Sequence, residues 1–128
     1  PPNVSYGTSV STWVLGGRDV QQKFTGDMMG QPFSGIGFTG YDNLKQQYWG
    51  TWRDNMSTGL MTSTGNTTDG GKTWKFASVA TDPMTGKDSK GEMIITVVDA
   101  NHHNMEMWGE GPDGKNFKMM EIAYTRKK

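Results

Sequence analysis

Short segments of alternating apolar and polar residues follow one another along the whole chain. Turn signals separate them, among them Tyr41-Asp42-Asn43, Asp69-Gly70-Gly71-Lys72 and Pro112-Asp113-Gly114-Lys115. Alternation with period two is typical of strands that bury one face, and tight turns between such strands favour antiparallel hairpins. The sequence therefore predicts an all-β fold of about nine strands with little or no helix. We expect these strands at Ser5 to Val14, Arg18 to Thr25, Phe33 to Tyr41, Lys45 to Arg53, Thr58 to Asn66, Lys72 to Thr81, Glu92 to Val98, His103 to Glu110 and Phe117 to Arg126.

Hairpin-connected strands tend to curl into one sheet, so we expect an antiparallel up-and-down β-barrel with room for side chains or one small ligand. The length of 128 residues fits a single domain, 1–128. Leucine, a good helix former, occurs only at Leu15, Leu44 and Leu60, whereas glycine occurs 18 times. Glycines within strands, such as Gly35 and Gly37, are expected where the sheet bends or where the backbone approaches a neighbour closely.

Charge and cysteine content exclude several classes of protein. Lysine and arginine together number 13, as do aspartate and glutamate, so the net charge of zero makes nucleic acid an improbable partner. The chain contains no cysteine, which excludes disulfides, thiolate metal sites and cysteine nucleophiles. It also lacks an apolar run of the roughly 20 residues that a membrane span needs. We expect a soluble protein. The sequence leaves its cellular compartment open, and the bacterial cytoplasm is the default expectation.

The strand faces suggest candidate ligand contacts. Alternation places bulky aromatic residues together on the predicted inner face, with a few polar tips among them. Such a mixture suits an oriented amphipathic ligand. Most inward side chains of a small barrel serve as core, which is the favoured interpretation for Trp74, Phe76, Ile95 and Val97. The candidate ligand contacts are Gln22, Phe24, Tyr48, Trp52, Asp54, Trp74, Met107, Tyr124 and Arg126.

Catalytic signatures are few, and we predict no catalytic residue, no metal site and no cofactor. His102 and His103 are adjacent, so a strand points them to opposite faces and they cannot share one metal. An inward His103 could ligate haem iron, although a turn histidine is more often solvated. Glu106, Glu110 and Glu121 could form a carboxylate pair, but a charge ladder with a lysine on the outer face explains them equally well.

Several motifs together resemble a known family. They are Trp13-Val14-Leu15-Gly16-Gly17-Arg18, Gly35 to Asn43 and Tyr48-Trp49-Gly50-Thr51-Trp52, with Thr81 to Lys87 and Met120 to Lys127 towards the C-terminus. This combination is similar to the bacterial family called domain of unknown function 1579, which is placed with the lipocalin-like, or calycin, barrels. The resemblance implies an antiparallel barrel and, by analogy, a small apolar ligand. It carries over no catalytic residue.

Relatives in this family usually begin with a further strand before the Thr12-Trp13 strand, and this chain begins after it. The resemblance thus implies a short barrel seam with unpaired strand edges, for which an edge-to-edge or swapped homodimer is a hypothesis. Relatives also tend to carry an apolar residue where this chain has Asp19, so we expect Asp19 to face water or a partner.

The sequence thus favours binding of a small hydrophobic or amphipathic molecule inside the barrel. Two alternatives remain open. One is an isomerase- or hydrolase-type enzyme that uses Asp54 or His103 as a buried acid or base. The other is a ligand-free structural or interaction module whose interior is filled by tryptophan and methionine.

Overall fold

The computed structural model describes residues 5–28, 30–56, 58–81, 86–110 and 113–126. Nine antiparallel strands form a single sheet, and a short 3-10 turn, η1 (Leu15–Gly17), joins the first two. No α-helix occurs in these ranges. The strands are β1 (Gly7–Val14), β2 (Asp19–Met28), β3 (Gln31–Asp42), β4 (Gln47–Asp54), β5 (Met61–Thr67), β6 (Thr73–Thr81), β7 (Asp88–Asp99), β8 (His102–Glu110) and β9 (Asn116–Thr125).

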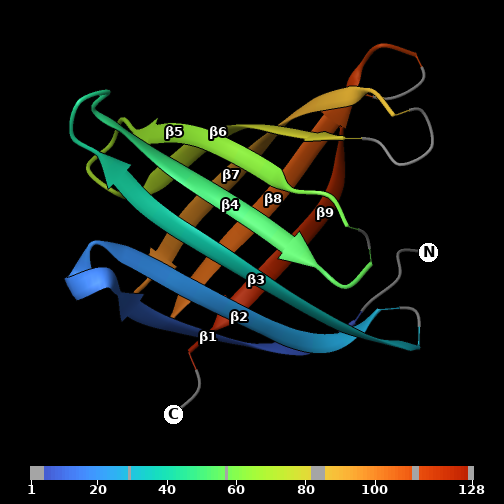
Figure 1. Ribbon diagram of the computed structural model, residues 1–128, viewed down its shortest axis with the longest axis horizontal. Helices are drawn as coiled ribbons and strands as arrows, with labels where there is room; N and C mark the ends of the chain where they lie inside the picture. Colours follow the sequence, from blue (N-terminus) through green and yellow to red (C-terminus); the bar gives the residue numbers. More distant parts are fainter. Residues whose placement is uncertain (1–4, 29, 57, 82–85, 111–112, 127–128) are drawn as a thin grey trace.

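The sheet is a simple meander in which each strand pairs with its neighbours in sequence. Figure 1 shows how it curls: β2, β3 and β4 lie in front, β7, β8 and β9 lie behind, and β5 and β6 connect the two sides. The predicted all-β antiparallel fold is confirmed, as a half-barrel built from one curled sheet. Such a curl gives the sheet a concave and a convex face.

Side-chain hydrogen bonds fix the turns that the sequence predicts. Between β5 and β6, the Asp69 carboxylate accepts hydrogen bonds from the backbone N–H groups of Lys72 and Thr73 at 3.1 and 2.8 Å. Gly70 and Gly71 in the same turn have φ of 77° and 104°, which glycine adopts without steric cost. These hydrogen bonds also lower the pKa of Asp69. The turn chemistry therefore sets the register of this hairpin.

The two edges of the sheet do not pair with each other in the described ranges. β1 pairs only with β2, and β9 pairs only with β8. One hydrogen bond spans the two sides of the curl, from Gln22 Nε2 on β2 to the Tyr124 hydroxyl on β9 at 3.5 Å. In the described ranges the sheet is therefore open along this seam.

Little of this sheet is fully buried. Phe76 on β6 is 5 % exposed, and Ser63 and Ser78 are buried beside it. Trp74 and Ile95 are half-buried, as their predicted core role requires. Val97, predicted as core, is exposed, because it lies near the end of β7 where the curled sheet no longer covers it. The described part of the chain contains no helix of the length and apolarity that a membrane crossing requires.

Candidate functional site

The candidate ligand contacts lie on one face of the sheet. Residues paired across antiparallel strands point to the same side, so each register can be followed from strand to strand. Gln22 and Tyr124 meet across the curl, which identifies their side as the concave one. The registers place the predicted contacts on β2, β4, β6, β8 and β9 on this concave face: Gln22, Phe24, Tyr48, Trp52, Asp54, Trp74, Met107 and Tyr124.

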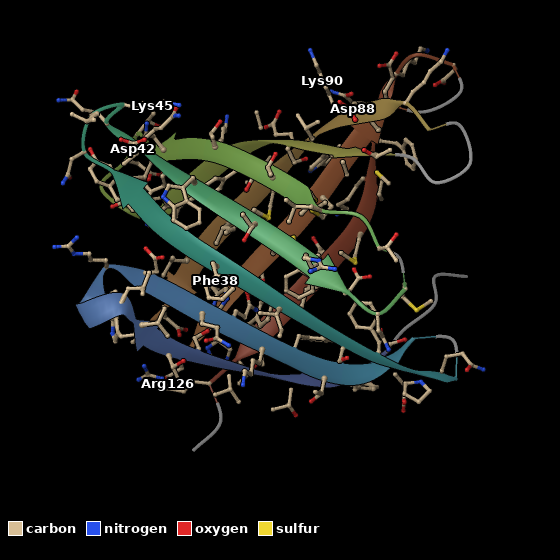
Figure 2. The ribbon with its side chains drawn as sticks, in the orientation of Figure 1. Phe38, Asp42, Lys45, Asp88, Lys90 and Arg126 are labelled. Carbon is tan, nitrogen blue, oxygen red and sulfur yellow. The ribbon has the colours of Figure 1, made fainter. Side chains whose placement is uncertain are left out.

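Arg126 is separated from this group. It follows the end of β9 and is exposed, and its backbone N–H donates to the Asn101 carbonyl at 2.7 Å. Figure 2 shows it beyond the end of the strand. The arrangement brings the other predicted contacts to one surface and leaves Arg126 at its rim.

Aromatic rings form a continuous line on the concave face. Tyr41 and Tyr48 contact each other edge to face with ring centroids 4.7 Å apart, and Tyr48 contacts Trp74 in the same way at 4.8 Å. Strand β5 lies between β4 and β6. It contributes Gly65, which has no side chain to separate the Tyr48 and Trp74 rings. Edge-to-face contacts of this kind favour fixed ring positions. The line therefore forms a firm apolar wall that crosses β3, β4 and β6.

Methionines line the opposite side of the concave face. Met93, Met107 and Met120 are register partners on β7, β8 and β9. A bulge between Met107 and Trp108 inserts Met119, whose sulfur lies against Gly109 on the same side. Met120 is 39 % exposed and Met119 is 61 % exposed. Because methionine is flexible and polarisable, this wall can adapt to ligands of different outline.

A cluster of neutral polar groups lies between the two walls at the seam. Gln22 Nε2 donates to the Ser9 hydroxyl at 2.8 Å and to the Tyr124 hydroxyl at 3.5 Å. The His103 ring stacks on Tyr124 with centroids 4.4 Å apart and an interplanar angle of 10°. Burial raises the pKa of Tyr124, and the hydrogen bond from Gln22 offsets part of that effect. The phenol is therefore neutral and can hydrogen-bond a ligand without a formal charge.

Trp52 lies flat against the backbone of β3. A Cβ atom at Gly35 or Gly37 would overlap the indole ring, so these glycines permit the close approach that their positions in the sequence suggested. The Trp52 Nε1–H donates to Asp54 Oδ2 at 2.9 Å, and the Met56 N–H donates to Asp54 Oδ1 at 3.0 Å. Both carboxylate oxygens are thus engaged within the protein.

Formal charges are divided unequally between the two faces. The registers of the described strands place one charged side chain on the concave face, Asp54. This count leaves out Asp99, which lies at the irregular end of β7. Figure 2 shows Lys90 pointing away from the sheet. The charged strand residues of the convex face are Asp19, Lys23, Asp27, Asp42, Arg53, Lys75, Asp88, Lys90, Glu92, Glu106, Glu110, Lys118 and Glu121.

The fold and these motifs agree with a comparison against protein families. The family described as Protein of unknown function (DUF1579) matches residues 1–126. The chain belongs to the DUF1579 family. No curated protein matches the chain. Membership confirms the sequence resemblance over nearly the full length.

Two glutamates of this DUF1579 chain, Glu106 and Glu121, form a charge ladder with Lys118 on the convex face. Lys118 Nζ lies 3.2 Å from Glu121 Oε2 and 3.7 Å from Glu106 Oε2. Trp108 Nε1 also donates to Glu106 at 3.2 Å. Of the two interpretations of these carboxylates, the structure therefore supports the charge ladder with a lysine. The described residues include no group of three or more histidine, aspartate or glutamate side chains that could hold a metal ion.

The two histidines point to different sides, as their adjacency predicts. His102 Nδ1 lies 2.9 Å from Asp99 Oδ1 at the outer edge of the turn, whereas His103 pairs with Val97 and Tyr124 on the concave side. Tyr124 covers one face of the His103 ring. His103 is therefore part of the polar cluster at the seam.

His103 makes protein stability depend on pH. Burial lowers its pKa, so the unfolded chain binds this proton more readily than the folded protein. The contribution of neutral His103 to the free energy of unfolding is fully present above the unfolded-state pKa of about 6.5. It decreases as the pH drops through that value. We expect urea unfolding midpoints to decrease between pH 7.5 and pH 5.5, and His103→Gln to reduce the decrease. The same slope in both proteins would show that His103 contributes nothing.

Sequence reasoning gave no ligand role to several members of the concave face, among them Tyr41, Met93 and Phe117. Tyr41 was assigned no ligand role, although its alternation within the Phe33 to Tyr41 segment was a usable signal. Phe117 lies on this face through its pairing with Gly109. Met119 joins it only because of the bulge, for which the sequence carries no clear signal.

Proposed function

We propose that this protein binds one small, uncharged apolar molecule against the concave face of its sheet. The observation that carries the proposal is a wall of aromatic and methionine side chains that the chain's own residues leave partly open. Apolar surface that remains exposed in a concave site is typical of binding sites. The hydrophobic gain from covering such surface is about 25 cal/mol per Å².

The charge distribution supports a ligand without formal charge. An ionised group on this face would lose part of its hydration and meet no free counter-charge, since Asp54 is already engaged by Trp52 and Met56. A neutral hydroxyl or carbonyl could instead bond to the Gln22 and Tyr124 cluster. The proposed ligand therefore has an apolar body with a neutral polar end at the seam.

An enzyme that uses the same face has less support. Both oxygens of Asp54 accept hydrogen bonds from within the protein, and His103 is stacked on Tyr124. Asp54 is therefore poorly placed to accept a substrate proton. Binding without chemistry is thus the function that this geometry supports best.

A charge placed on the methionine wall tests the binding site. We expect Met120→Lys to weaken the binding of 1-decanol at least about tenfold, because an ammonium group on this face disfavours burial under an apolar chain. Ala77→Lys introduces the same group on the exposed convex face of β6 and should leave binding unchanged. Binding is measured by isothermal titration calorimetry, and far-UV circular dichroism verifies that both variants fold.

Native mass spectrometry of the protein purified from bacteria tests whether a natural ligand is retained. A retained stoichiometric compound that is uncharged and apolar would support the proposal and give its chemistry. Equal 1-decanol affinity in both lysine variants, or no binding to the wild-type protein, would contradict it.

The open seam motivates a second proposal, a homodimer formed along it. The outer edge of β1 carries no charged residue and no proline, which are the features that usually prevent strand pairing. Light scattering coupled to size exclusion tests this separately. A monomer at all concentrations up to about 1 mM would remove the homodimer and leave the ligand proposal intact.

A further inference from the structure

A second depression lies mainly on the convex side of the sheet, at the end of β4 where Gly35 and Asp54 of the concave side also border it. It has a volume of about 480 Å³, within the range of small-molecule sites. Its floor comes from β3 and β4, where Ile36 pairs with Arg53 and Phe38 pairs with Thr51. Figure 2 shows Phe38 on β3. The lining residues are Ser34, Gly35, Ile36, Phe38, Thr51, Arg53, Asp54, Asn55 and Leu60.

Hydrogen bonds hold the rim of this depression in place. Asn55, which follows β4, receives a bond from the Ser34 N–H to its Oδ1 at 3.1 Å and donates its own N–H to the Ser34 carbonyl at 3.0 Å. Its Nδ2 also donates to the Pro32 carbonyl at 3.2 Å. Three bonds therefore tie the start of the β4–β5 connection to β3. This connection contributes Leu60 to the depression.

Apolar side chains of the depression are left open to solvent. Ile36 is 44 % exposed and Leu60 is 50 % exposed, and Phe38 stands between strands that carry mostly polar residues on this side. Isolated apolar side chains on a surface are ordinary, but three that converge on one hollow form a site for an apolar group.

One cation of the depression has no acidic partner among the described residues. Arg53 projects on the convex side, and none of the ion pairs of the described residues includes it. The neighbouring carboxylate of Asp54 is bonded to Trp52 and Met56 instead. Lys23 on β2 pairs with Ile36 and adds a second positive charge beside the hollow. Arg53 and Lys23 contribute two positive charges and Asp54 one negative charge, so the local net charge of +1 is complementary to an anion.

The geometry points to a second binding site on the convex face, which takes a small organic anion with an apolar body. Its apolar part covers Ile36, Phe38 and Leu60, and its carboxylate pairs with the Arg53 guanidinium. Arginine binds carboxylates through two parallel hydrogen bonds, which orients the anion in the hollow. This site selects for negative charge, in contrast to the concave face, and it does not depend on the proposed concave function.

A matched pair of probes tests this site. 4-Phenylbutyrate and 4-phenylbutan-1-ol share one apolar body and differ in their charged and neutral ends. We expect 4-phenylbutyrate to give intermolecular nuclear Overhauser effects to the Ile36 methyl groups. We also expect Arg53→Gln to weaken its binding about tenfold, the effect of losing one charge-assisted contact at a surface. Lys75→Gln removes a charge of the same sign from the convex face of β6 and should leave the affinity unchanged.

Two results would overturn the convex site. One is equal 4-phenylbutyrate affinity in Arg53→Gln and the wild-type protein. The other is nuclear Overhauser effects from 4-phenylbutyrate to the Met107 methyl group alone, which would place the anion on the concave face. Binding of 4-phenylbutan-1-ol is measured separately, by nuclear Overhauser effects to the Met107 methyl group. Failure of the concave proposal is therefore distinguishable from failure of this one.

Discussion

Replacing Gly65 with alanine is expected to lower the free energy of unfolding by about 3 kcal/mol, the upper part of the range for overpacked sites. A Cβ atom at this position would overlap the Lys75 carbonyl oxygen and press on the backbone of Phe76. Backbone atoms cannot rotate away as a flexible side chain can, so β5 and β6 would have to separate. The measurement is urea unfolding followed by circular dichroism.

Thr64→Ala is the matched control for this substitution. Thr64 precedes Gly65 on β5, and its side chain is exposed on the convex side. We expect a change within about 0.5 kcal/mol, as for other exposed positions. A Gly65→Ala protein as stable as the Thr64→Ala protein would show that β5 and β6 are not packed as closely as described.

The second large effect is expected at Phe76, the apolar side chain buried most completely among the described residues. Phe76 is 5 % exposed and lies between Gly65 and Met93 on the concave face. Phe76→Ala should lower the free energy of unfolding by about 3 kcal/mol, because the ring's burial is lost and a cavity remains. Phe76→Leu should recover part of this loss. Thermal unfolding of both variants measures the difference.

Phe117→Ala serves as the comparison for Phe76→Ala. It removes the same ring from the concave face at a position on β9 that is about half exposed. We expect a cost near 1 kcal/mol, since little burial is lost there. Equal costs at both positions would contradict a core centred on β6.

The strand pattern of the sequence predicted the faces of the sheet because side-chain direction follows period two regardless of the rest of the fold. Trp74 and Phe76 were expected on one side of their strand, and Tyr48 and Trp52 on one side of theirs. The structure places them so. The same rule separated His102 from His103. Local alternation was sufficient for these residues.

Features that depend on distant parts of the chain could not be predicted in this way. The bulge that turns Met119 to the concave side arises from how β8 and β9 fit together. Val97 is exposed because of how far the sheet curls, which no local pattern encodes. The convex depression combines Ile36 with Leu60 from a different connection, so only the folded chain brings its residues together.

The two proposals assign ligands of opposite kinds to the two faces of this sheet. The concave face joins aromatic and methionine walls to a neutral polar cluster at Gln22 and Tyr124. The convex face carries most formal charges of the described strands, and at Arg53 it combines apolar surface with a cation that forms no ion pair among the described residues.

Methyl-labelled methionine offers the most direct test of binding at the concave face. The ε-methyl groups of Met61, Met93, Met105, Met107 and Met120 lie on that face, whereas Met56 follows β4 outside it. Titration with 1-decanol, followed by carbon–proton correlation spectra, should shift the concave methyl signals with one common saturation curve and leave Met56 in place. Unchanged concave signals, or a shift confined to Met56, would contradict a ligand site on the concave face.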